Sequence, residues 1–127
     1  MYLRRRNIDK RDQEKPRVWR AAIYLSESDP KATGAGSEPS IARQRRRCHS
    51  TATALGAEVL GEFVDTRLYV SLWPELHQAL ELAQEQRLDY LIVSSLDRLP
   101  KNRDDVFEVA WRLGHAGTVP TPASEDD

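Results

Sequence analysis

The distribution of apolar and polar stretches along the chain predicts three β-strands. Short apolar runs occupy residues 21–25, 58–64 and 89–95. Each run is shorter than an ordinary helix, and polar stretches separate them, which is typical of strands that are buried in a sheet. We therefore expect these runs to form the centre of the fold.

A first helix is predicted between the first two apolar runs. It follows Ser40, a residue type that caps helix N-termini, and it ends at Gly56, a residue type common at helix C-termini. The apolar stripe is thin, because only Ile41, Cys48 and Leu55 recur at intervals of seven residues. We expect Cys48 to be a small buried apolar residue rather than a nucleophile.

Two further helices are predicted from the same spacing rule. The second begins at Pro74, which suits a first helical turn. Its apolar stripe consists of Leu76, Ala79, Leu80 and Ala83. The third begins at Asn102 or Asp104 and closes at Gly114 or Gly117. The side chains predicted to face inward on this helix are Val106, Phe107, Ala110 and Leu113.

The alternation of strand and helix predicts an α/β fold. Strand–helix–strand repeats are typical of a small, parallel-rich sheet with crossover helices. Val119 begins a candidate fourth strand, but Pro120 and Pro122 exclude a normal central strand because proline lacks the N–H that a sheet needs. We expect the sheet to be incomplete beyond this point.

Length and charge predict one small domain with charged flanks. The 127 residues carry a net charge of −1, and 31% of them are Asp, Glu, Lys or Arg. We interpret residues 1–19 as a basic disordered arm, residues 20–119 as the folded domain and residues 120–127 as an acidic tail. A basic arm can bind polyanions such as nucleic acid.

Other sequence features exclude several classes of protein. A single cysteine rules out an intramolecular disulfide and fits a reducing cytoplasm. No apolar run approaches the length of a membrane span, and no apolar segment of a secretory signal follows the basic arm. His49, His77 and His115 are far apart, so no spacing typical of a metal site is present and we expect no metal or cofactor. We predict a soluble cytoplasmic protein.

Polar side chains follow all three predicted strands. Ser26, Glu27 and Ser28 come after the first strand and Asp65 after the second. Asp97, Arg98 and Lys101 come after the third. Because parallel strands place their carboxyl ends at one edge of the sheet, where ligands bind in open α/β folds, we expect a functional site there.

This set of motifs resembles the catalytic domain of the serine recombinases, the resolvase and invertase family. That family has a first strand ending Tyr-x-Arg-x-Ser, a helix with Ser before it and Gln within it, and a second strand ending in Asp. Its third strand ends Asp-Arg-Leu-x-Arg. Here the matching segments are residues 23–28, 40–44, 55–65 and 96–102, with Trp73-Pro74 at the start of the second predicted helix. The resemblance covers residues 20–119 in unbroken order.

The resemblance implies a reaction and assigns residues to it. In the family a serine hydroxyl attacks a DNA phosphodiester and forms a covalent protein–DNA link, arginines neutralise the phosphate, and strand exchange follows in a tetramer. Carried over by position, Ser28 matches the nucleophile and Asp97 and Arg98 match the acid–arginine pair. Gln44 and Asp65 match supporting site residues. Lys101 stands at the last basic position of the motif.

The sequence departs from the family pattern at several positions. Ser26 and Trp73 stand where the family has arginines, Leu68-Tyr69 replaces a Ser-Gly pair, and Lys101 replaces an arginine and so loses its bidentate fork. We therefore expect a truncated catalytic domain with degenerate active-site motifs and impaired strand cleavage. Family members continue with a long subunit helix and usually a DNA-binding domain, so we expect weak or absent assembly here.

Two alternatives to an active recombinase remain open. The first is an inactive relic, or a regulatory partner of a complete recombinase, that binds DNA through a basic helix face. The arginines predicted to form that face are Arg43, Arg45, Arg46 and Arg47. The second is a receiver-like domain that uses Asp65 and Asp97, which ranks lower because no acidic pair follows the first strand.

Overall fold

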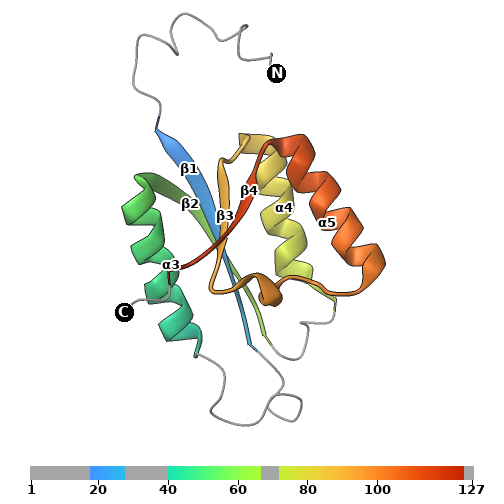
Figure 1. The fold of residues 1–127 in the computed structure, drawn as a ribbon, viewed down its shortest axis with the longest axis horizontal. Helices are drawn as coiled ribbons and strands as arrows, with labels where there is room; N and C mark the ends of the chain where they lie inside the picture. Colours follow the sequence, from blue (N-terminus) through green and yellow to red (C-terminus); the bar gives the residue numbers. More distant parts are fainter. Residues whose placement is uncertain (1–17, 28–39, 67–71, 125–127) are drawn as a thin grey trace, which may run out of the picture.

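The three apolar runs of the sequence form three neighbouring strands of one sheet (Figure 1). The computed structural model describes residues 18–27, 40–66 and 72–124. Along the chain lie β1 (Trp19–Ser26), α3 (Ile41–Leu55), β2 (Ala57–Asp65), α4 (Pro74–Gln86), β3 (Tyr90–Val93), the 3-10 helix η2 (Leu96–Arg98), α5 (Arg103–Ala116) and β4 (Val119–Pro122). The four strands of the described sheet are parallel, in the order β2-β1-β3-β4. This confirms the predicted α/β fold.

Strand β1 lies inside the sheet and is buried on both faces. Its residues 21–25 are fully buried, which explains why the run is apolar throughout rather than alternating. Ala22 and Tyr24 pack on the side of α4 and α5, whereas Ala21, Ile23 and Leu25 pack on the side of α3. The two faces of one strand therefore create two separate hydrophobic cores.

Helices α3 and α4 form where their spacing and end residues predict. The Ser40 hydroxyl accepts a hydrogen bond from the Arg43 N–H (3.1 Å), and Gly56 ends α3 at a positive φ of 70°. The predicted stripe of α4 is fully confirmed, because Leu76, Ala79, Leu80 and Ala83 are all buried against the sheet.

Helix α5 presents a different face to the core than its sequence predicts. Val109, Leu113 and Ala116 are buried, whereas Phe107 is 70% exposed and Val106 is 44% exposed. Ala110 is also exposed. The prediction that Val106, Phe107 and Ala110 face inward is therefore wrong, and only Leu113 is correct. The helix carries apolar residues on two faces, and the contact with α4 decides between them.

Strand β4 forms the edge of the sheet, as its prolines require. The Val119 N–H donates to the Asp89 carbonyl (2.9 Å), and the Ala123 N–H donates to the Val93 carbonyl (2.7 Å). Along an edge strand, successive backbone N–H groups point alternately toward the neighbouring strand and away from it. Pro120 and Pro122 occupy the positions whose N–H would point away. Neither outward position has a donor to offer another strand.

The described elements move two predicted boundaries. Trp19 already belongs to β1, and residues 120–122, assigned to the tail from the sequence, belong to β4. Residues 1–17 of the predicted arm and residues 125–127 of the predicted tail lie outside the described residues. Among the described helices, none is both long and apolar enough to cross a membrane.

We expect two truncations on α5 to change the free energy of unfolding by very different amounts. Leu113→Ala removes a buried side chain and should lower the free energy of unfolding by about 2–5 kcal/mol. Phe107→Ala removes an exposed one and should change it by about 0.5 kcal/mol or less. Urea denaturation measures both values. A larger loss for Phe107→Ala would show that the helix faces the core as the sequence predicts.

Cys48 should react with thiol reagents only when the protein unfolds. Its side chain is fully buried. Burial raises the pKa of Cys48 to about 12, although the nearby charge of Arg47 lowers it and the smaller effect of Glu62 raises it. Thiolate is the reactive form, so modification at neutral pH should be slow in buffer and fast in urea. Equal rates in both solutions would contradict this burial.

Candidate functional site

The carboxyl ends of β1, β2 and β3 meet at one edge of the sheet, as predicted. Ser26 pairs in register with Asp65, and the Glu27 N–H donates to the Asp65 carbonyl (3.0 Å). Ser94 and Ser95 follow β3 at the same edge, because Tyr24 pairs with Val93. The edge therefore brings together polar residues from three separate parts of the chain.

The Asp65 carboxylate accepts three hydrogen bonds at this edge. It is 1% exposed. It accepts hydrogen bonds from the Tyr24 hydroxyl (2.7 Å), the Glu75 N–H (2.9 Å) and the Leu76 N–H (3.2 Å). The last two donors belong to the first turn of α4, where a negative charge is favourable. Asp65 therefore caps α4 from outside the helix and fastens it to β1 and β2.

Gln44 fastens α3 to the end of β1. Its side chain is fully buried. Its Nε2 donates to the Ser26 carbonyl (2.9 Å), and its Oε1 accepts from the Ser26 N–H (3.3 Å) and the Ser94 hydroxyl (3.5 Å). One amide group thus fixes both backbone polar groups of the last residue of β1.

Arg98 also bonds to Ser26, from η2. It lies in η2, is only 7% exposed, and donates from Nη1 to the Ser26 carbonyl (3.3 Å). Burial of a guanidinium is costly unless its donors are used. The arginine of the predicted acid–arginine pair therefore lies within the edge and points toward the end of β1.

The remaining residues predicted after β3 lie differently. Asp97 is exposed and accepts a hydrogen bond from the Ser95 hydroxyl. It therefore stabilises the turn after β3 and does not bond to Ser26 as Arg98 does. Lys101 is exposed just before α5. The structure therefore brings Gln44, Asp65 and Arg98 together around Ser26 and leaves Asp97 and Lys101 at the rim.

Some of the predicted residues lie outside the described part of the chain. Ser28, the predicted nucleophile, and Leu68-Tyr69 are among them. The two positions that lack the expected arginine are described. Ser26 is 2% exposed, and Trp73 packs partly buried against the core with a left-handed backbone (φ 56°) just before α4. Within the described edge, Arg98 is the cation directed at Ser26.

Tyr24 is a site residue that the sequence analysis missed. Its hydroxyl is buried, and burial together with the hydrogen bond to Asp65 raises the pKa of Tyr24 far above its usual value near 10. It therefore stays a neutral donor to the carboxylate. The available signal was a hydroxyl in an otherwise aliphatic buried run, because buried tyrosine hydroxyls need a partner.

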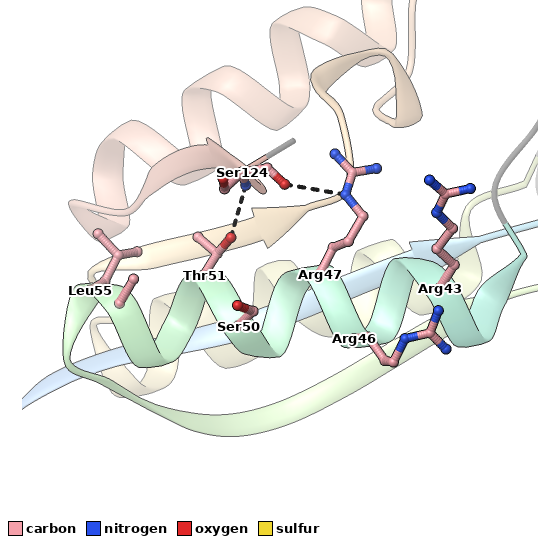
Figure 2. Close-up of a pocket in the computed structure, with 8 residues that line it drawn as sticks. Arg43, Arg46, Arg47, Ser50, Thr51, Leu55 and Ser124 are labelled. Atoms are coloured by element: carbon pink, nitrogen blue, oxygen red, sulfur yellow. Dashed lines mark hydrogen bonds between the residues drawn. The ribbon is translucent and has the colours of Figure 1, made fainter. Parts of the chain in front are cut away.

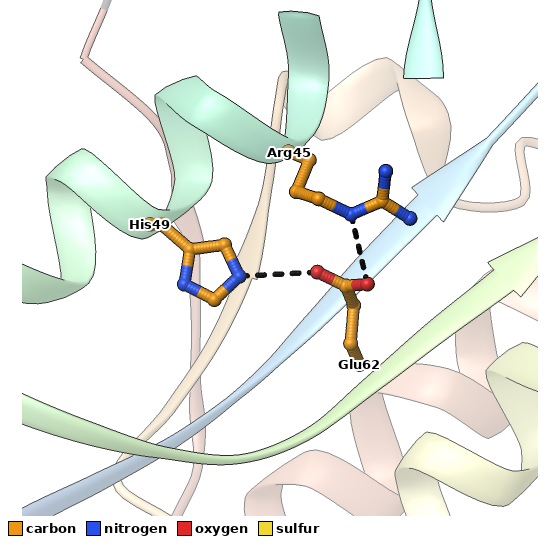
Figure 3. A network of polar contacts seen from close by, with 3 residues as sticks. All are labelled: Arg45, His49 and Glu62. Carbon is orange, nitrogen blue, oxygen red and sulfur yellow. Dashed lines mark hydrogen bonds and ion pairs between the residues drawn. The ribbon is translucent and has the colours of Figure 1, made fainter. Parts of the chain in front are cut away.

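The four arginines predicted on one face of α3 divide into two groups. Arg45 forms an ion pair with Glu62 of β2 (2.9 Å), and His49 bonds the other oxygen of Glu62 (3.1 Å), as Figure 3 shows. Desolvation opposes ionisation of Glu62, but the bonds from Arg45 and His49 outweigh it and lower the pKa of Glu62. Arg45 is therefore engaged on the β2 side of α3.

The other three arginines line a pocket of about 510 Å³ between α3 and the end of β4 (Figure 2). We call it the arginine pocket. Its polar lining consists of Arg43, Arg46, Arg47, Ser50, Thr51 and Ser124. Two bonds close its β4 side: the Arg47 Nε–H donates to the Ser124 carbonyl (3.2 Å), and the Ser124 N–H donates to the Thr51 hydroxyl (2.9 Å).

The described residues contain no group of three His, Cys, Asp or Glu side chains that could hold a metal ion.

The family model described as Resolvase, N terminal domain, matches residues 24–119. The chain belongs to this resolvase family. The match contains β1 from Tyr24 onward, helices α3, α4 and α5, and the edge formed by Gln44, Asp65 and Arg98. It favours the recombinase interpretation over the receiver-like alternative. No curated protein sequence matches the chain.

Two solved structures show the same fold as this resolvase-family chain. One is the C-terminal catalytic domain of ISC1926 TnpA, an IS607-like serine recombinase, with a TM-score of 0.63 and 19% identity over 84% of this chain and 71% of that chain. The other is a resolvase family site-specific recombinase from Streptococcus pneumoniae, with a TM-score of 0.62 and 17% identity over 83% of this chain and 72% of that chain. They confirm the resolvase-like fold.

We expect Asp65→Asn to destabilise this resolvase-family domain more than Tyr24→Phe does. Asn turns an amide N–H₂ toward donors that the carboxylate now satisfies, so the free energy of unfolding should fall by roughly 2–4 kcal/mol. Tyr24→Phe removes one hydrogen bond and should cost roughly 1–2 kcal/mol. Thermal and urea unfolding measure both. A stable Asp65→Asn variant would contradict the capping role.

Proposed function

We propose that this chain is a recombinase-type catalytic domain that transfers DNA strands through a serine–phosphodiester intermediate. The Ser28 hydroxyl attacks a DNA phosphorus, a serine–phosphate bond forms, and the DNA oxygen on the other side of the phosphorus leaves as a hydroxyl. Arg98 neutralises charge on the phosphate oxygens. Such transfers depend mainly on positioning and charge stabilisation, which this set of residues supplies without a metal.

The observation that supports this proposal best is the position of Arg98. Its guanidinium is buried at the sheet edge and bonded to the Ser26 carbonyl, two residues before Ser28. Gln44 fixes the same peptide from α3. The backbone that leads to Ser28 is therefore held at Ser26, beside the Arg98 guanidinium. Rigid support of this kind is what a reacting group requires.

We further propose that cleavage is weakened in this chain. Ser26 and Trp73 carry no charge where the resemblance implies arginines, and Lys101 can supply only a single point charge. Loss of one charge-stabilising donor costs about 10²–10³ in rate. Asp97 would act indirectly, by holding the turn that carries Arg98.

A second candidate function is that of an inactive relic or a regulatory partner of a complete recombinase. The buried environment of Ser26 and the core packing of Trp73 favour it, because neither position leaves an obvious place for the missing charge. In this case the domain would bind DNA, or pair with itself or with a complete recombinase in the cytoplasm, without cutting.

Covalent trapping separates the two candidates. The protein is mixed with a pool of radiolabelled nicked duplexes of random sequence and denatured in detergent, and covalent adducts are resolved by gel electrophoresis. The active form predicts a labelled adduct that Ser28→Ala abolishes and that Arg98→Gln reduces about 10²-fold or more. Thr53→Ala, an exposed hydroxyl on α3, serves as the control and should leave the adduct unchanged.

An adduct that persists in Ser28→Ala would refute Ser28 as the nucleophile. The absence of any adduct at high protein concentration would refute the active form and favour the relic.

A further inference from the structure

We propose that the arginine pocket is a second DNA-contact site, which grips the phosphate backbone beside the catalytic edge. The pocket is large enough for a small ligand group and is lined by three guanidiniums and two helix hydroxyls. Its lining contains no carboxylate among the described residues. The inference rests on the proposed function, because it assumes that DNA is the substrate.

The charges in the pocket are available for a ligand. Within the described part of the chain, the side chains of Arg43 and Arg46 form no ion pair or hydrogen bond, whereas Arg45 between them is paired with Glu62. Arg47 uses its Nε–H on Ser124 and retains its terminal N–H groups. Uncompensated guanidiniums gathered at a concave surface attract an anion, and their planar fork suits phosphate oxygens.

Helical spacing places the lining residues of α3 on neighbouring turns of the helix. Arg43 and Arg47 are four residues apart and Arg46 is three from Arg43, so they are neighbours about one turn (5.4 Å) apart. Ser50 and Thr51 follow on the next turn. In Figure 2 Arg43 and Arg47 extend on the Ser124 side of α3, and Arg46 extends on the other side. Three guanidiniums therefore line the pocket along the N-terminal half of α3.

The N-terminal half of the helix adds to this attraction. Arg43, Arg46 and Arg47 lie in the first two turns of α3, near the positive end of its dipole. The first turn contains no acidic residue. At the other end of the pocket Ala54 and Leu55 offer apolar contact to a sugar.

The position of the pocket favours a polymer over a free phosphate compound. Arg43 directly precedes Gln44, whose amide fixes the end of β1 at the catalytic edge. The pocket therefore begins one residue from the edge and continues away from it along α3. A DNA backbone that places one phosphate at Arg98 can place another in the pocket. Phosphate contacts set the register of a duplex without reading its sequence.

Salt-dependent binding tests this assignment. Binding of a fluorescein-labelled duplex of mixed sequence is followed by fluorescence anisotropy over a series of salt concentrations. The slope of log Kobs against log salt should decrease by about one for each phosphate contact removed. We compare Arg43→Gln, Arg46→Gln and Arg47→Gln, singly and combined, with Arg45→Gln. The last is the matched control, because it removes the same charge from the same helix outside the pocket.

The expected result is a loss of slope and affinity in the three pocket variants and little change in Arg45→Gln. An equal loss in Arg45→Gln would overturn the proposal, because net charge alone would then explain binding. Unchanged binding by the combined variant would also overturn it. A parallel titration with AMP distinguishes a free phosphate ligand: AMP binding that requires the pocket, with a duplex slope that does not, would refute the DNA assignment.

This test separates the pocket from the proposed function. Ser28→Ala should keep the full salt slope while it loses the covalent adduct. If neither the unmodified protein nor any variant forms an adduct, but the pocket variants still lose salt slope, strand transfer is refuted and the DNA-contact site stands. If the adduct forms and the pocket variants bind normally, only the pocket is refuted.

Discussion

The fold and the candidate site both depend on one buried carboxylate. Asp65 ends β2, accepts the Tyr24 hydroxyl from β1 and accepts two N–H groups from the start of α4. A buried carboxylate is stable only when its oxygens are satisfied, so it requires all three partners to keep their places. The carboxyl edge of the sheet is therefore fixed relative to the helix that covers it.

The same edge shows how a small domain can position a charged site. Ser26 lies beside Asp65 in the sheet, and its carbonyl accepts from both Gln44 and Arg98. Three segments that are distant in sequence thus converge on one peptide. Every buried side-chain nitrogen and oxygen in the described residues has a hydrogen-bond partner. The arrangement orients Arg98 before any ligand is present, which is the main requirement of charge-based catalysis.

Sequence periodicity predicts the helices unequally well, for a physical reason. In α4 the buried stripe from Leu76 to Ala83 is flanked by polar residues, so only one face can be apolar. In α5 apolar residues lie on two faces, and periodicity alone does not choose between them. The core selects Val109 over the larger Phe107 through contact with α4. The order of strands and helices, by contrast, follows directly from the apolar runs.

Part of the residue set at the sheet edge was predictable from the sequence, but the contacts of those residues were not. The resemblance selects Gln44, Asp65 and Arg98, and the structure brings them to one edge. Their partners are backbone groups of Ser26 and α4, which no residue pattern reveals. The separation of Arg45 from its neighbours depends on Glu62, which comes beside α3 only when β2 pairs with β1.

We propose that DNA binds at the carboxyl edge around Arg98, and a map of amide chemical shifts tests this proposal most directly. The ¹⁵N-labelled protein is titrated with duplex DNA and followed by NMR. We expect the largest changes in amide chemical shift at Ser26, Glu27 and η2, and a second group of changes along the N-terminal half of α3. Changes confined to α5 and β2, or no changes at the edge at saturating DNA, would contradict it.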